Sequence, residues 1–116
     1  MDVTDRRALG RLISVIEEFR RLDPEMQAQQ MLTLLIVALR EGEPVKVIGG
    51  ALGLSQAAAS RNVSYWTDWH WRKRAGLDMI EAVEDKMERR RKLVTLKPKG
   101  KRFIAKIAYL MKGEAA

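Results

Sequence analysis

Apolar residues recur at three- and four-residue spacing near both ends of the chain, which is typical of helices with one buried face. The first such stripe predicts a helix over about residues 4–22 and consists of Leu9, Leu12, Ile13, Ile16 and Phe19. The second predicts a last helix over about residues 98–111 and consists of Ile104, Ile107, Ala108 and Met111. Both helices therefore need a partner for their apolar sides.

A second helix is predicted to begin at Asp23-Pro24-Glu25 and to stop at Gly42. Aspartate is a good N-cap, proline fits the first helical position, and an acid is favourable at the positive end of the helix dipole. Apolar residues occupy much of the circumference between Met31 and Leu39. We expect this helix to be central in the fold.

Two short helices are predicted next, over residues 45–52 and about 56–66, with Gly53 at the turn between them and Ser55 as N-cap of the later helix. This arrangement is typical of a helix-turn-helix, here over about residues 44–66, whose later helix enters the major groove of DNA. Helical spacing predicts an inner face of Ala59, Val63 and Trp66, and an outer face of Ala57, Arg61 and Ser64 with Gln56 and Ser60 beside them.

Beyond the helix-turn-helix, residues 79–84 and 92–96 are short strand-like runs joined by a highly charged connection. A hairpin in this place is the wing of a winged helix, here over about residues 79–97. The sequence thus predicts a single domain over residues 1–116 that is mainly α with a small β-hairpin wing: a winged helix-turn-helix.

The net charge of +7 is unevenly distributed along the chain. Residues 1–44 carry six Arg or Lys and eight Asp or Glu, whereas residues 45–116 carry 16 and seven. A polyanion such as DNA would bind the second portion. The sequence has no cysteine and no long apolar run or secretory signal, so we expect a cytoplasmic location and no membrane contact.

Three segments together resemble the MarR-type winged-helix transcriptional regulators. They are residues 52–61 (Leu-Gly-Leu-Ser-Gln-Ala-Ala-Ala-Ser-Arg), 84–90 (Glu-Asp-Lys-Met-Glu-Arg-Arg) and 93–100 (Leu-Val-Thr-Leu-Lys-Pro-Lys-Gly). The resemblance extends over about residues 31–110. It implies a recognition helix in the major groove, a wing in the minor groove, and a homodimer formed by helices at about residues 1–23 and 98–112. Relatives often bind small aromatic ligands between helices, although no residues here identify such a pocket.

The chain departs from the family pattern at five places. The family usually finishes with one or two long dimerisation helices, whereas the last helix predicted here stops near Met111. Lys97 replaces the usual threonine N-cap of the last helix, and Glu88 stands where the family's wing has an aspartate. Asn62 occupies a position where an apolar residue is common, which indicates either a polar partner or a rotated helix. Residues 67–78 form a longer link than usual between recognition helix and wing.

Basic and polar side chains of three segments are the candidate DNA contacts. Arg61 can read guanine with two hydrogen bonds, and Gln56 can read adenine. Alternatively, Arg61 binds phosphate or an acid, and a wing arginine pairs with Asp85 or Glu88. The full set comprises Ser55, Gln56, Ala57, Ser60, Arg61 and Ser64 of the recognition helix, Arg72, Lys73 and Arg74 of the link, and Lys86, Arg89, Arg90 and Arg91 of the wing.

The remaining unusual residues favour structural roles. We expect Trp66 in the core, and Trp69 and Trp71 to pack the link onto the body. The alternative for these tryptophans is base stacking or a ligand cage. His70, the only histidine, has only Asp68 nearby as a second metal ligand, so no metal site is predicted. No pattern of catalytic residues or phosphate-binding glycines is recognisable. We expect no enzyme activity and no cofactor.

These observations predict a sequence-specific regulator of transcription that binds double-stranded DNA and represses as a homodimer, in a bacterial cytoplasm or a phage-infected bacterial cell. The alternative is a winged-helix adaptor that binds a protein or RNA partner, such as a replication or polymerase-modulating factor. The operator sequence, the sign of regulation and any effector are not encoded in recognisable form.

Overall fold

The computed structural model describes residues 1–70 and 74–113. In this part of the chain it contains five helices: α1 (Val3–Leu22), α2 (Ala28–Leu39), α3 (Val45–Leu52), α4 (Gln56–Trp66) and α5 (Pro98–Lys112). Its strands are β1 (Glu43–Pro44), β2 (Trp69–His70), β3 (Arg74–Ala75), β4 (Ile80–Glu84) and β5 (Lys92–Leu96). This is the predicted winged helix.

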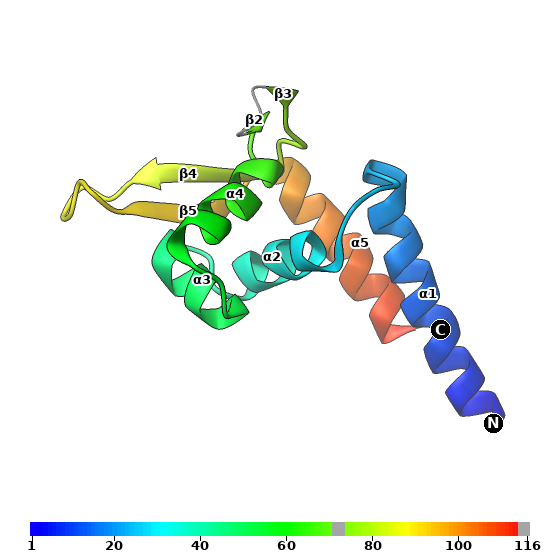
Figure 1. Cartoon of the computed structure of the whole chain (residues 1–116). Helices are drawn as coiled ribbons and strands as arrows, with labels where there is room; N and C mark the ends of the chain where they lie inside the picture. Colours follow the sequence, from blue (N-terminus) through cyan, green and yellow to red (C-terminus); the bar gives the residue numbers. More distant parts are fainter. Residues whose placement is uncertain (71–73, 114–116) are drawn as a thin grey trace.

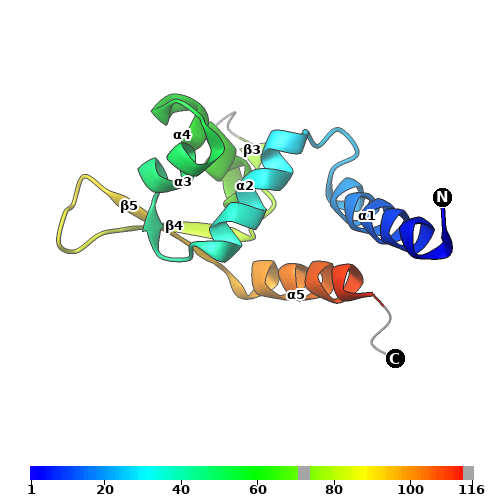
Figure 2. The same ribbon diagram turned by 90° about the horizontal axis from the view of Figure 1, so that it is seen from below.

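The molecule is elongated, with extents of 52 × 28 × 27 Å. Figure 1 shows α1 and α5 side by side at one end and the hairpin β4–β5 projecting at the other. In Figure 2, α2 lies between α4 and α5, as expected for a central helix. None of the described helices is both long and apolar enough to span a membrane.

The core forms where α2, α3 and α4 pack on the sheet. Leu34, Ile48, Trp66, Ile80 and Val94 are fully or almost fully buried and come from five different elements. The Trp66 indole N–H also donates to the Gln30 carbonyl at 2.7 Å, so its one polar group is satisfied. The predicted core position of Trp66 is confirmed.

The predicted start of the second helix is wrong, because α2 begins at Ala28. The Asp23 carboxylate accepts from the Glu25 N–H at 3.0 Å, and the Met26 N–H donates to the Asp23 carbonyl at 3.0 Å. These bonds form a turn instead of a helical first turn. The helix is capped later, where the Gln30 side chain accepts from the Gln27 N–H at 2.9 Å.

Helix α1 packs on α5 with one side only. Val15 and Phe19 are buried, and the Phe19 ring meets Phe103 edge-on with centroids 5.2 Å apart. Lys106 of α5 also pairs with Glu18 at 2.7 Å, and this hydrogen bond lowers the pKa of the Glu18 carboxyl. The other members of the predicted apolar stripe, Leu9, Leu12, Ile13 and Ile16, remain exposed. Helix α5 therefore covers only part of the apolar stripe of α1.

The wing sheet has three antiparallel strands in the order β1-β5-β4. Strands β4 and β5 pair over five positions, from Ile80 opposite Leu96 to Glu84 opposite Lys92. The predicted wing hairpin is therefore present. The third strand, β1, pairs Glu43 with Val94 and was not predicted, because two residues are too few to display a strand pattern.

Strands β2 and β3 form a second small hairpin, in the segment that was expected to be an extended link. Trp69 pairs with Ala75 in this hairpin. The Trp69 side chain is 60% exposed, so the expectation that it packs onto the body is wrong. Main-chain hydrogen bonds connect the hairpin to the end of α4. Trp71 lies outside the described residues.

Candidate nucleic-acid interface

The outer side of α4 presents the predicted recognition residues together. Gly53, with φ of +69°, ends α3 in the left-handed conformation, and the Ser55 hydroxyl then caps α4 by accepting from the Ala58 N–H at 3.2 Å. Helical spacing places the remaining candidates on the side away from the core. Ser55, Gln56, Ala57, Ser60 and Arg61 are exposed, and Ser64 is half-buried.

The inner side of α4 is bonded to the region around the start of α2. Asn62 is buried and donates to the Gln29 side-chain oxygen at 3.2 Å and to the Ala58 carbonyl at 2.8 Å. The Tyr65 hydroxyl donates to the Asp23 carboxylate. Of the two interpretations of Asn62, the polar partner is therefore the one observed. These bonds fix which side of α4 faces outward.

A groove of 570 Å³ lies along the side of α4 that faces the start of α2. It is bounded by the start of α2, by α4 and by the end of the small hairpin, and Arg61 is one of its lining residues. Asp23, Glu25 and three glutamines also line it, so the groove is polar and carries both signs of charge. Arg61 thus stands between the exposed side of α4 and a region that contains acids.

The wing tip is organised by one aspartate. The buried Asp85 carboxylate accepts from Arg91 at 2.6 and 3.0 Å and from the Met87 N–H at 2.9 Å. The hydrogen bonds from Arg91 are the main cause that lowers the pKa of Asp85. Of the two acids considered for the wing, Asp85 forms this close pair.

The basic residues of the wing therefore differ in their surroundings. Arg91 is paired with Asp85, while Arg89 lies 3.9 Å from Glu84 and its side chain is 87% exposed. Lys86 and Arg90 are also exposed. Arg89 is therefore held less closely by its carboxylate than Arg91, and the more exposed cation is better placed to bind a phosphate.

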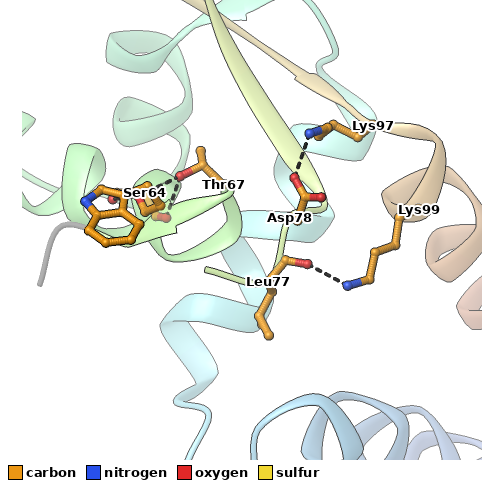
Figure 3. Close-up of polar contacts among 7 residues, drawn as sticks. Ser64, Thr67, Leu77, Asp78, Lys97 and Lys99 are labelled. Carbon is orange, nitrogen blue, oxygen red and sulfur yellow. Dashed lines mark hydrogen bonds and ion pairs between the residues drawn. The ribbon is translucent and has the colours of Figure 1, made fainter. Parts of the chain in front are cut away.

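The base of the small hairpin is fixed to α4 and to the start of α5 (Figure 3). Lys97 pairs with Asp78 at 2.6 Å, and this hydrogen bond raises the pKa of Lys97. Lys97 makes no N-cap bond with its side chain, as expected for a residue replacing threonine. Arg72 and Lys73 lie outside the described residues, and the main chain of Arg74 belongs to β3.

A metal centre has no support in the described ranges, 1–70 and 74–113. They contain no group of three His, Cys, Asp or Glu side chains placed to hold an ion. The described side chains at the outer side of α4 and at the wing can form hydrogen bonds and carry positive charge.

No family model matches the chain, and no curated protein matches it in sequence. Solved structures share its fold. The PcaV transcriptional regulator from Streptomyces coelicolor, in complex with its natural ligand, superimposes with a TM-score of 0.56 at 22% identity, covering 78% of this chain. This chain spans 65% of the length of PcaV.

Two further structures extend the likeness. MarR matches with a TM-score of 0.61 at 16% identity, over 89% of this chain and 74% of MarR. The S. aureus MepR–DNA complex matches with a TM-score of 0.65 at 20% identity, over 90% of this chain and 82% of MepR. The chain therefore has the winged-helix fold of MarR-type regulators, as its motifs predicted.

Proposed function

We propose that the protein is a transcriptional regulator that binds double-stranded DNA sequence-specifically as a homodimer and represses by occluding a promoter. The observation that carries this proposal is the outer side of α4. It combines small residues, Ala57 and Ser60, with the longer Gln56 and Arg61, and all four are exposed. Small side chains let a helix approach base edges closely, and the longer ones can bond to them.

The wing supports the same proposal through its charge. Lys86, Arg89 and Arg90 are exposed at the tip of the β4–β5 hairpin. The narrow minor groove of A/T-rich DNA concentrates negative potential and attracts arginine. MepR, which shares the fold, was solved as a complex with DNA. The same proposed surface includes the remaining candidate DNA contacts, which are Ser55, Ser64, Arg72, Lys73, Arg74 and Arg91.

The homodimer is proposed from the exposed stripe of α1. Ile13 is 61% exposed, and Leu9, Leu12 and Ile16 extend the same apolar strip, with Tyr109 and Met111 exposed on the neighbouring α5. A continuous apolar strip on an exposed helix is stabilised when a second copy covers it. Two copies would present two recognition helices to a palindromic site.

Selection of bound sequences from random duplex DNA tests the function. We expect enrichment of a palindromic motif. On that motif Arg61→Ala should lower affinity by about 1–3 kcal/mol and relax selection at one position per half-site. Arg102→Ala, which removes an exposed arginine from α5 instead, is the matched control and should bind normally.

Two results would contradict this assignment. Equal loss of affinity for specific and random DNA in Arg61→Ala would remove the base-reading role of Arg61. Retained binding to polyanions without any enriched motif would favour the adaptor alternative, in which the basic surface meets a protein or RNA.

The assembly has its own test. Sedimentation at micromolar concentration should give about twice the 13.3 kDa chain mass. Ile13→Glu should give a folded monomer, because Ile13 is exposed within one chain and its replacement disturbs no core contact. A stable monomer of the unmodified protein would exclude the two-half-site arrangement.

A further inference from the structure

The β2–β3 hairpin carries an exposed tryptophan beside the recognition helix. Trp69 is 60% exposed, whereas Trp66, three residues earlier, is completely buried. Tryptophan has the largest side chain, is highly buried on average and is enriched at interfaces, so an exposed indole is a candidate for contact with another molecule.

The main chain around Trp69 is fixed to the end of α4. The Gly76 N–H donates to the Asp68 carbonyl at 3.0 Å, and the Asp78 N–H donates to the Thr67 carbonyl at 3.0 Å. Gly76 lies so close to Thr67 that a Cβ at Gly76 would be 1.9 Å from the Thr67 carbonyl oxygen. The hairpin base is thus packed against the helix end without room for a side chain.

Two lysines at the start of α5 hold the residues that follow β3. Lys97 pairs with Asp78 at 2.6 Å, and Lys99 donates to the Leu77 carbonyl at 2.9 Å (Figure 3). These bonds anchor the base of the hairpin to α4 and α5. A main chain that is held in place before binding loses little conformational entropy when it binds, which favours its use in recognition.

Trp69 is also bonded directly to the proposed DNA-binding side of α4. The Ser64 hydroxyl donates to the Trp69 carbonyl at 3.2 Å, and the Thr67 hydroxyl lies 3.1 Å from the same oxygen. Ser64 belongs to the outer side of α4. The main chain of Trp69 therefore continues this surface past the last turn of the recognition helix.

The charge around the hairpin favours a polyanion as the molecule that Trp69 meets. The sequence of residues 69–75 contains three basic residues and no acidic one. The hairpin base has two acids: Asp78 is paired with Lys97, and the exposed Asp68 precedes Trp69, so the three basic residues still outnumber the acids. Beside a recognition helix, the nearest polyanion is the DNA backbone that borders the major groove.

We propose that Trp69 contacts the sugar–phosphate backbone of DNA next to the bases that α4 faces, which makes the β2–β3 hairpin a third DNA-binding element. The proposal rests on the proposed function. The flat face of the indole packs on a deoxyribose, and its N–H donates to a phosphate oxygen. The contact adds affinity without adding charge.

Binding of Trp69→Ala to the selected duplex tests this contact. We expect a loss of about 3- to 10-fold, as for the loss of one hydrogen bond of ordinary strength. The slope of log affinity against log salt should not change, because the lost side chain is neutral. Trp69→Phe should retain part of the affinity. Leu39→Ala is the control, because Leu39 is 82% exposed at the other end of α2.

Shortening the duplex provides a second measurement, in which each protein is compared with itself on duplexes of different length. Removing flanking base pairs one at a time should lower the affinity of the unmodified protein at a step where Trp69→Ala loses nothing further. Hydroxyl-radical footprinting should show the same backbone positions protected only when Trp69 is present.

Different outcomes would contradict the role of Trp69 and the proposed function of the whole protein. Affinity of Trp69→Ala within twofold of the unmodified protein, with an unchanged footprint, overturns the inference while the DNA-binding function stands. Absence of duplex binding by the unmodified protein overturns both.

Discussion

The two β-hairpins of the molecule are held in place by different means. The wing has strands of five residues, paired over five positions and joined by β1 on the other side. Its inward residues Ile80, Val94 and Leu96 are buried in the core. The small hairpin has two paired positions, and its exposed Trp69 adds nothing to the core.

The two hairpins should therefore be destabilised by different kinds of substitution. Burial of strand side chains stabilises the wing, and such a contribution is spread over many residues. A two-residue hairpin cannot be stable by its own pairing. It depends on a few main-chain hydrogen bonds, on the absence of a side chain at Gly76, and on Lys97 and Lys99. The small hairpin should therefore fail through single substitutions at its base.

The largest expected effect comes from Gly76→Ala. The new Cβ would lie 1.9 Å from the Thr67 carbonyl oxygen, so the main chain at the hairpin base has to move. We expect a loss of about 1–3 kcal/mol or more in the free energy of unfolding, as for other overpacked sites. Urea unfolding at equilibrium measures it.

Gly50→Ala is the matched control for this substitution. Gly50 lies in α3, and a Cβ there meets nothing within 4 Å. Alanine is the better helix former, so this variant should gain about 0.5–1 kcal/mol. Equal stability of the two variants would show that the hairpin base tolerates a side chain and that the difference drawn between the hairpins is wrong.

The sequence predicted the regular elements and missed the irregular ones for a physical reason. The helices α3 and α4 and the strand β5 have the predicted bounds, because each repeats a helix or strand period over several residues. Strands β1, β2 and β3 have two residues each, too few for any period. Apart from the pair of Lys97 with Asp78, the bonds that hold the small hairpin go to main-chain carbonyls, which every residue has.

The candidate site likewise has features that sequence spacing predicted and features that only the folded structure shows. Helical spacing was sufficient to place Arg61 on the outer side of α4, because period alone decides the face. The partner of Asn62 is Gln29, 33 residues away, and only the packing of α2 on α4 brings them together. Asp85 and Glu88 are both close to Arg91 in sequence, so the choice between them required the geometry of the wing tip.

A smaller effect is expected from Asp85→Asn in the wing. The substitution weakens the bonds to Arg91 and to the Met87 N–H but leaves the strand pairing. Loss of a hydrogen bond of ordinary strength should make exchange of the Met87 amide about 2- to 10-fold faster, without global unfolding. Hydrogen exchange followed by NMR measures this local change.

Glu88→Gln is the control for the wing, since it removes an exposed carboxylate from the same tip. Exchange of the Met87 amide should then stay unchanged. If the two variants give the same rate, Asp85 has no special role in organising the tip, and the wing would depend on strand pairing alone.

The smallest effect should appear at alkaline pH and only in the small hairpin. The hydrogen bond from Lys97 to Asp78 raises the pKa of Lys97 above its ordinary value of 10.5. Its contribution to stability is therefore complete below pH 10.5 and is lost as the pH rises through the raised pKa. In the wing, the lowered pKa of Asp85 means that its contribution is lost in acid, as the pH falls below 3.8.

Titration of the Lys97 side chain by carbon-detected NMR, in the unmodified protein and in Asp78→Asn, tests this difference. Asp78 has φ of +57°, a conformation that asparagine also adopts, so the variant changes charge with little change in the main chain. The Lys97 midpoint should fall in Asp78→Asn, and the stability difference between the two proteins should shrink above pH 10.5. An identical midpoint in both would mean that Asp78 does not hold Lys97 in solution, which would leave the hairpin base anchored by its main chain and Lys99.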